Sequence, residues 1–382
     1  MNDKIKEYYK EIDYKIKLAY QIAEKARSLN YDPVNHVEIP LARNMAERVE
    51  GLISTVAPQI KGSGVVQRIE ELEKQYGKLD WRVASIVSLE VAKEKFCKFE
   101  NKLKSMEVGI RVGLAYLSNG VVSSPLEGFT DLKIKKRRDG NEYFCLMFSG
   151  PIRSAGTTIT CGSIFVADYI RKNMGYDVYD PSEQEIKRMV IEVYDYHEKV
   201  TNIQYLPSEE EIEYMISHLP LQIDGDPSEK FDVSNYKDLD RIETNKLRNG
   251  ICLVTGEALC QKAPKFWGKI SKFYKEFEME QWKFLEDFVA LQKKMKAVVS
   301  LNKKGEPSWF LFDLYSFWEF ICRIDEKLFE KLSDEEYDSV TIGKLIDAIE
   351  AKWPFNENDK VRIKKEYERA LKNISEGKIY GP

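Results

Sequence analysis

The sequence lacks several features that would assign it at once to a common class of protein. It has no run of about 18 apolar residues, so no membrane span is expected. The first residues lack the apolar centre of a signal peptide. No Gly-Lys pair is followed by Ser or Thr, which excludes a Walker phosphate loop. The six cysteines include no Cys-x-x-Cys pair, so we expect reduced, buried thiols and a cytoplasmic protein.

Histidine is also scarce. The sequence has three, His36, His197 and His218. His197-Glu198 begins like a zinc-protease motif, but Thr201 stands where the second histidine is required. No nucleophile, histidine and acid can be grouped by spacing. We therefore expect no metal centre built on histidine and no resident cofactor in this chain.

What the sequence does contain is enough material for two or three packed domains. It has 382 residues, of which 43% are hydrophobic and 32% are charged. The formal net charge is −4, whereas proteins that coat nucleic acid are usually basic. Any contact with nucleic acid must therefore be local, or shared with a partner chain.

Hydrophobic patterning predicts the α+β class. Most of the chain has helical periodicity, but "VGIRVGLAYLSNGVVSS" alternates and is rich in β-branched residues, which predicts strands. "LKIKKRR", Asp139-Gly140 and "NEYFCLMF" predict a β-hairpin with a two-residue loop, in which Arg137 faces Glu142. The expected fold is mostly helical, with a small antiparallel or mixed sheet around residues 107–148 and helical N- and C-terminal parts.

Changes in pattern divide the chain into three parts. Residues 1–100 are expected to be a helical N-terminal region, and residues 101–297 an α+β domain. The stretch 298–307, "VVSLNKKGEP", is typical of a linker. Residues 308–382 are then expected to form a helical C-terminal module.

Cap residues mark where several helices begin. Asp80 has N-cap chemistry, and Ser182 with Glu185 and Ser208 with Glu211 have the spacing of a capping box. These signals predict helices near 81–97, 182–199 and 208–218.

The glycine-rich stretch "MFSGPIRSAGTT" lies between a predicted strand and a predicted helix. That geometry can present backbone N–H groups to an anion, and Arg153 could add a bidentate contact to phosphate. Alternatively, Gly150-Pro151 bends the chain and Gly156 allows close helix packing. The spacing favours the turn, with any anion contact secondary.

The densest basic run is "KIKKRR". Neutralisation of phosphates is one interpretation, and a solvated edge strand guarded by lysines is the other. The two are evenly balanced. The cations concerned are Lys133, Lys135, Lys136, Arg137 and Arg138.

The string "QIDGDPSE" places Asp224 and Asp226 two residues apart, as in carboxylate pairs that hold Mg²⁺. A metal-dependent nuclease would use them in this way. Such a string is also ordinary turn chemistry, and no third acid stands at a known metal spacing. We favour the turn and keep the two aspartates as weak metal candidates.

Seven aromatic residues crowd the stretch "WFLFDLYSFWEF" near the C-terminus. A buried core helix is the default interpretation. Because aromatic residues are enriched at the centres of interfaces, the alternative is a contact surface for another subunit. The candidate interface residues are Trp309, Phe312, Phe317 and Trp318.

Long stretches of the chain closely resemble the N-terminal part of the large subunit of the archaeal family D DNA polymerase, also called DNA polymerase II. The resemblance runs in order and at matching spacing from about residue 5 to about residue 297. The stretches include "VNHVEIPLARNMAERVEGLI", "GSGVVQRIEELEKQYGKLDWRVA", "GVVSSPLEGFTDLKIKKRRDGNEYFCLMFSGPIRSAGTT", "YDYHEKVTNIQYLPSEEEIEY", "QIDGDPSEKFDVSNYKDLDRIETNKLRNG" and "EQWKFLEDFVALQKK".

The resemblance implies a role in DNA replication. The family's large subunit continues into two double-psi β-barrels whose aspartates bind Mg²⁺ and carry out nucleotidyl transfer, and this chain has no room for them. The resemblance without the barrels implies a non-catalytic scaffold. Its expected partners are DNA, the small exonuclease subunit or the catalytic remainder of the large subunit, and self-association is left open. The basic run and Arg153 then become candidate DNA contacts, and Mg²⁺ is expected only in the complete polymerase.

The chain departs from the family after "SAG", where Thr157 to Thr160 replace a second glycine and small residues. This departure argues against a phosphate-binding role for the loop. The alternative function is a stand-alone, catalytically inactive relative that binds polymerase subunits or DNA through its helical tail.

Overall fold

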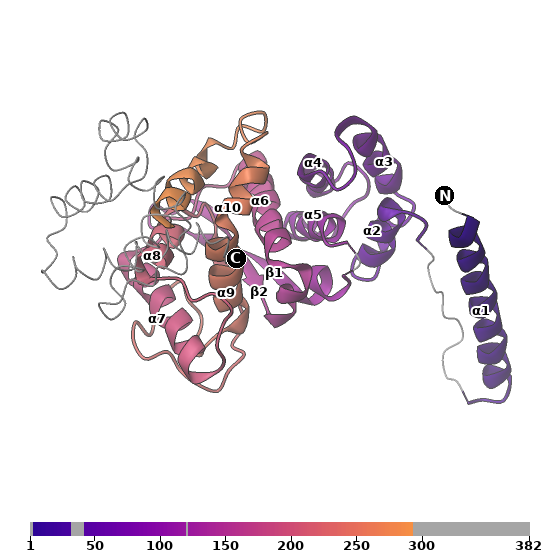
Figure 1. The fold of residues 1–382 in the computed structure, drawn as a ribbon, viewed down its shortest axis with the longest axis horizontal. Coiled ribbons are helices and arrows are strands. Elements are labelled where there is room, and N and C mark those ends of the chain that lie inside the picture. The colour runs from indigo at the N-terminus through magenta and orange to yellow at the C-terminus, as the bar shows by residue number, and fades with distance from the viewer. Residues whose placement is uncertain (1–2, 32–41, 120, 293–382) are drawn as a thin grey trace, which may run out of the picture.

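The structure, a computed structural model, describes residues 3–31, 42–119 and 121–292, which are mostly helical around a three-stranded sheet (Figure 1). The predicted α+β class with a small mixed sheet is confirmed. The predicted linker and C-terminal module, with all four candidate interface aromatics, lie outside the described residues. None of the helices in the described ranges is both long and apolar enough to cross a membrane.

Helix α1 (Asp3–Ser28) is the first element, and none of its residues is buried. In Figure 1 it lies to one side of the other helices. Asp3 in its first turn and Arg27 in its last turn complement the helix dipole. Because no face of α1 is covered, its apolar side chains contribute little to the core.

A group of helices builds the N-terminal half of the core. They are α2 (Met45–Ile53), α3 (Val65–Tyr76), α4 (Trp81–Ala92), α5 (Lys102–Leu117) and α6 (Thr157–Asn173). Asp80 caps α4 as predicted, because its carboxylate accepts the N–H of Arg82 at 2.8 Å. Trp81, the first residue of α4, packs against Phe266 at 5.8 Å between ring centroids.

Helix α5 corrects the prediction of strands in "VGIRVGLAYL". Every residue from Ser105 to Leu117 is buried, so the helix has no polar face to produce a 3.6-residue signal. Gly109 and Gly113 bring α5 close to its neighbours: a Cβ on Gly109 would lie 2.6 Å from the carbonyl oxygen of Ser88 in α4. Burial on all sides thus overrides the β-branched composition.

The sheet begins later than predicted, at Phe129. Strands β1 (Phe129–Lys136) and β2 (Glu142–Phe148) are antiparallel, and β3 (Gln222–Asp224) pairs with β2 in parallel. Arg111 of α5 supports the start of β1, since its guanidinium donates to the carbonyl oxygens of Phe129 and Thr130, both at 2.6 Å. The third strand arrives from a distant part of the sequence.

The predicted hairpin is confirmed, but its predicted register is wrong by one residue. Lys136, not Arg137, lies opposite Glu142. The N–H of Arg137 donates to the carbonyl of Asn141 at 2.8 Å, so three residues form the loop. Gly140 takes the left-handed conformation, with φ of 91°, that such a loop places after a type I turn.

The second half of the described chain adds further helices (Figure 1), of which α9 (Asn249–Leu253) contacts β2 and β3. They are α7 (Glu183–Lys199), α8 (Glu209–His218), α9 (Asn249–Leu253), the π-helix η4 (Val254–Cys260) and α10 (Gln261–Ile270). Short helical turns are η1 (Pro58–Ile60), η2 (Ser124–Gly128), η3 (Gly150–Ala155) and η5 (Glu280–Lys283), and residues 284–292 are helical. Both predicted capping boxes are confirmed, at Ser182 and at Ser208.

The contact at Gly109 provides a test of the α4–α5 packing. We expect Gly109→Ala to lower the free energy of unfolding by about 1–3 kcal/mol, because the new methyl group would collide with backbone. Gly268→Ala is the control: a Cβ there meets nothing within 4 Å, and Gly268 lies inside α10. Urea denaturation should show a loss for the first variant and an equal or greater stability for the second. Equal effects would contradict the close approach.

Candidate functional site

The basic run of β1 lies at the edge of the sheet, where successive side chains point to opposite faces. Lys133 lies opposite Cys145 and Lys135 lies opposite Tyr143, so both lysines share the face that carries those β2 residues. Lys136 is exposed. The run therefore does not present one continuous basic surface.

Lys133 and Lys135 both have acidic partners within the chain. The ammonium group of Lys133 lies 2.6 Å from a carboxylate oxygen of Glu243. That of Lys135 lies 3.0 Å from Asp224 and 3.6 Å from Glu243, and donates to the carbonyl of Arg241 at 2.8 Å. The Lys135 side chain is only 12% exposed, against 31% for Lys133.

The two arginines at the hairpin tip also have partners. Arg137 donates to the carbonyl of Val178 at 2.6 Å and pairs with Asp139 at 3.2 Å. Arg138 pairs with Asp180 at 3.1 Å, while its side chain stays 66% exposed. Arg138 and Lys136 are therefore the cations of this run that are most accessible to a ligand.

Asp224, at the end of β3, is buried, and donors surround its carboxylate. One oxygen pairs with the guanidinium of Arg248 and accepts the N–H of Gly225 at 2.8 Å. The other accepts from Lys135 at 3.0 Å and from Gln222 at 3.1 Å. Burial alone would raise the pKa of Asp224, but the positive charges of Arg248 and Lys135 outweigh it and hold the pKa below its ordinary value.

The Asp224 environment does not resemble a metal site. Its oxygens already accept hydrogen bonds from cationic and amide donors, and Asp226 is exposed. Across the described ranges, no group of three or more His, Cys, Asp or Glu side chains is placed to hold a metal ion. A ligand role for either aspartate would require these ion pairs to break.

Arg248 extends the buried charges into α7. Its Nε donates to Glu192 at 2.9 Å, and Glu192 also pairs with Arg188 at 3.1 Å. Arg188 in turn donates to the carbonyls of Tyr236 and Thr244, at 3.1 and 2.9 Å. These interactions join β3, α7 and the irregular segment before α9, and we call Asp224, Arg248, Glu192 and Arg188 the buried ion network.

Arg241 forms a second charged centre next to the network. It donates to Glu185 at 2.8 Å and to Asp180 at 2.5 Å, and its guanidinium lies 5.2 Å from the ring centroid of Tyr179. Tyr179 stacks on Tyr143 at 5.1 Å. Burial opposes ionisation of Asp180, but hydrogen bonds from Arg241 and Arg138 lower its pKa to about 2.

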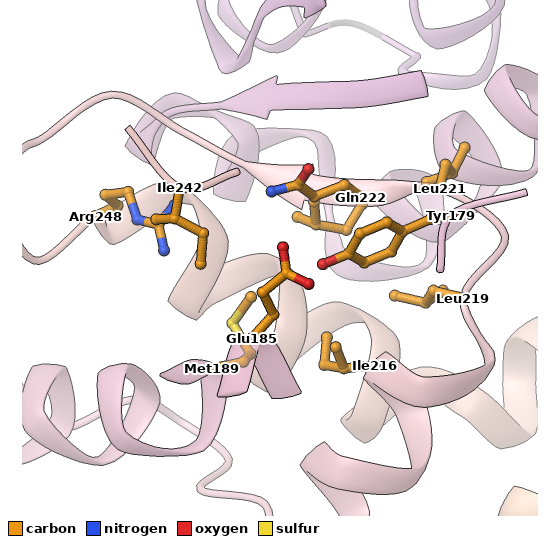
Figure 2. A pocket seen from close by; sticks show the side chains of 10 residues that line it. Tyr179, Glu185, Met189, Ile216, Leu219, Leu221, Gln222, Ile242 and Arg248 are labelled. Atoms are coloured by element: carbon orange, nitrogen blue, oxygen red, sulfur yellow. The ribbon is translucent and has the colours of Figure 1, made fainter. Parts of the chain in front are cut away.

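A small cavity lies between these centres (Figure 2). Figure 2 shows the hydroxyl end of Tyr179 turned toward the carboxylate of Glu185, above apolar side chains such as Ile216 and Met189. The free volume is about 10 Å³, which is room for about one water molecule. A nucleotide does not fit there, so this cavity is not a substrate pocket.

The glycine-rich loop turns the chain from β2 into α6. Residues Gly150–Ala155 form the 3₁₀ turn η3, and Gly156 has φ of 85° before α6 begins. Arg153 pairs with Glu257 of η4 at 2.9 Å, although its own side chain is 44% exposed. Glu257 is 1% exposed and also accepts the N–H of Gln204 at 2.9 Å. The Arg153 guanidinium is thus partly committed to a buried carboxylate.

Sequence reasoning missed the residues that organise this region. The sequence pattern predicted a site role for none of the five residues whose ion pairs hold the region together. They are Arg248, Glu192, Arg188, Arg241 and Glu243. Their partners lie far away along the chain: 56 residues separate Arg248 from Glu192. Only the abundance of charge in segment 225–248 could have indicated a polar cluster there.

Comparison with known proteins identifies relatives over most of the chain. The family described as DNA polymerase II large subunit DP2, N-terminal, matches residues 7–291. The DNA polymerase II large subunit of Nanoarchaeum equitans is 46% identical over 299 residues, which cover 78% of this chain and 24% of that protein. That of Pyrococcus furiosus is 39% identical over 310 residues, which cover 80% of this chain and 23% of that protein.

A third relative extends the similarity. The DNA polymerase II large subunit of Methanococcus maripaludis is 36% identical over 346 residues, which cover 89% of this chain and 28% of that protein. Because this match covers 89% of the chain, it extends beyond residue 297, where the stretches that resemble the family end. The chain spans about a quarter of the length of the curated relatives it matches. The resemblance to the N-terminal region is confirmed.

From the buried ion network we predict that Asp224→Asn lowers the free energy of unfolding by a large and pH-dependent amount. The variant removes one carboxylate partner from both Arg248 and Lys135 and leaves the buried cluster with excess positive charge, so we expect a loss of about 3–5 kcal/mol in the free energy of unfolding at pH 7. Because the pKa of Asp224 is lower in the folded than in the unfolded chain, its stabilisation is present above pH about 4 and is lost as the pH falls through the folded-state value.

Urea denaturation at several pH values measures this difference, which should be constant from neutral pH down to about pH 5 and shrink below about pH 4. Asp226→Asn removes the same charge from an exposed position two residues away and should change stability little. Equal losses for the two variants would show that Asp224 is not the anchor of the network.

Arg153 offers a separate test of the loop. Arg153→Met leaves the buried carboxylate of Glu257 without its cation, and we expect a loss of about 1–3 kcal/mol. The double variant with Glu257→Gln should recover part of the lost stability, because the uncompensated charge is gone. Thermal unfolding measures both effects. A fully stable Arg153→Met protein would free Arg153 for a purely ligand-binding role.

Proposed function

The chain belongs to the family of DNA polymerase II large subunits, whose N-terminal region it matches, and from this premise we propose that it acts in DNA replication as a non-catalytic part of that subunit. In this proposal the chain braces the polymerase and contacts DNA through the β1–β2 hairpin. The catalytic remainder of the large subunit, or the small exonuclease subunit, is the protein partner. Mg²⁺ serves the complete polymerase and is held elsewhere.

The state of Asp224 is the observation that carries the non-catalytic role. Nucleotidyl transfer needs carboxylates that are free to hold divalent ions next to the reacting phosphates. Asp224 is instead enclosed by Arg248, Lys135 and amide donors. The enclosure of Asp224 in the buried ion network supports a structural role and disfavours the nuclease hypothesis.

The hairpin tip supports local contact with DNA. Lys136 and Arg138 are exposed at the end of an edge strand, where a phosphate backbone can approach them without any change in the fold. The formal net charge of −4 confines favourable contacts to such local clusters. Lys133 and Lys135, which pair with carboxylates of the same chain, contribute less to this surface.

Helix α1 supports contact with a protein partner. None of its residues is buried, and Tyr8, Tyr14 and Ile22 are 62%, 67% and 64% exposed. Exposed aromatic and aliphatic side chains of this kind are typical of surfaces that another chain covers. The remaining large-subunit regions and the small subunit are the partners that the family suggests.

Salt-dependent binding tests the proposed DNA contact. The double variant Lys136→Gln/Arg138→Gln should bind duplex DNA more weakly and reduce the slope of log affinity against log salt by about one unit for each phosphate that is no longer neutralised. Fluorescence anisotropy over a salt series gives both quantities. Lys98→Gln, an exposed lysine outside the hairpin, is the control. An unchanged slope in the double variant would remove the hairpin from the DNA contact.

A further inference from the structure

The segment between β3 and α9 folds back on itself and lies against β1 and α7. Residues 226–246 form this segment, which we call the strap. The N–H of Val233 donates to Asn245 at 2.8 Å, so the two arms of the strap pair with each other. Asp195 of α7 accepts the N–H of Ser234 at 2.6 Å. The strap is irregular in secondary structure but is fixed at several points.

The returning arm of the strap places Glu243 over the lysines of β1. The Glu243 carboxylate lies 2.6 Å from the ammonium group of Lys133 and 3.6 Å from that of Lys135. Two lysines that converge on one carboxylate are also the donors that would converge on a phosphate oxygen. Glu243 therefore occupies an anion position that the basic strand itself creates.

The backbone on both sides of Glu243 is held independently of its side chain. Lys135 donates to the carbonyl of Arg241 at 2.8 Å, and Arg188 donates to the carbonyl of Thr244 at 2.9 Å. The Glu243 side chain is 57% exposed. It can therefore leave Lys133 by rotating into water, while the strap stays in place.

The pair between Glu243 and Lys133 is weak enough to exchange. Exposed ion pairs of this type change an equilibrium by only about two- to fivefold. The Lys133 side chain is 31% exposed, so a phosphate can approach it from solvent. The pKa of Glu243 lies below its ordinary value because of the hydrogen bond from Lys133, which keeps the competing carboxylate charged at neutral pH.

We propose that Glu243 is an intramolecular competitor of DNA: it occupies Lys133 in the free protein and is displaced by a backbone phosphate when DNA binds. This inference rests on the proposed contact between the β1–β2 hairpin and DNA, and it adds regulation of that contact. The competitor lowers the affinity of any anion for Lys133 by the modest factor that an exposed ion pair contributes. A polyanion that also contacts the exposed Arg138 gains enough affinity to displace it.

Removal of the competitor should strengthen DNA binding. We expect Glu243→Gln to raise affinity for a DNA duplex about two- to fivefold. The salt slope should stay close to that of the unsubstituted protein, because Lys133 meets a phosphate in both complexes and the counterions that are released come from the DNA. Lys133→Gln should lower affinity, and the gain from Glu243→Gln should vanish in the Lys133→Gln background.

The control for general repulsion is Asp240→Asn, which removes one negative charge from an exposed position on the same strap. Fluorescence anisotropy on all variants, with thermal unfolding to verify folding, separates the outcomes. A gain specific to Glu243→Gln and dependent on Lys133 supports the competitor. Equal gains for Glu243→Gln and Asp240→Asn overturn it and leave only a general field effect.

The failure of the competitor and the failure of the DNA contact give different results. If Lys133→Gln and Lys136→Gln/Arg138→Gln weaken binding while Glu243→Gln changes nothing, the hairpin binds DNA and the competitor is refuted. If none of these substitutions alters DNA affinity, the proposed DNA contact itself is wrong. In that case the Glu243–Lys133 pair is a surface ion pair without a regulatory role.

Discussion

The pairing of Asp224 with Arg248 in the protein interior is the interaction on which the rest of the structure depends. Both side chains are almost fully buried, and Glu192 closes the other side of the guanidinium. A buried charge that loses its partner costs several kcal/mol. Separating β3 from α7, or either from the start of α9, is therefore unfavourable, although β3 itself has only three residues. The buried ion network therefore holds β3 in place, because the backbone hydrogen bonds of so short a strand would hold it only weakly.

The same network decides which cations of β1 remain available. The second carboxylate oxygen of Asp224 also needs a donor, and Lys135 provides it from β1, on the other side of β2. Lys135 is thereby committed to the interior, although its place in a basic run indicates a ligand contact. Lys133 and Arg138 pair instead with carboxylates nearer the surface, Glu243 and Asp180, and their side chains keep access to solvent. The division between structural and accessible cations follows from where each acidic partner lies.

Sequence reasoning succeeded where the determining contacts are local. Capping boxes act over three residues, and those at Ser182 and Ser208 are present as predicted. It failed at α5, because a helix buried on all sides has no amphipathic pattern, and at the hairpin register, which one additional loop residue shifts. The buried ion network could not be predicted, since its members are brought together by tertiary structure. The family itself was identified from extended resemblance and not from any physical pattern.

Other arginines follow the rule that applies at Arg248. Arg171 pairs with Asp168, whose side chain is 0% exposed, and Arg111 pairs with Glu107 inside α5. Arg153 pairs with Glu257 in the same way, even though its own side chain is 44% exposed. A buried carboxylate cannot be left without its cation, so such an arginine is held in place whatever its own exposure. A cation that is paired with an almost fully buried carboxylate is therefore a poor candidate for ligand binding whatever its own accessibility. At the β1–β2 hairpin this criterion favours Lys133, whose partner Glu243 is 57% exposed, over Lys135, whose partner Asp224 is 4% exposed.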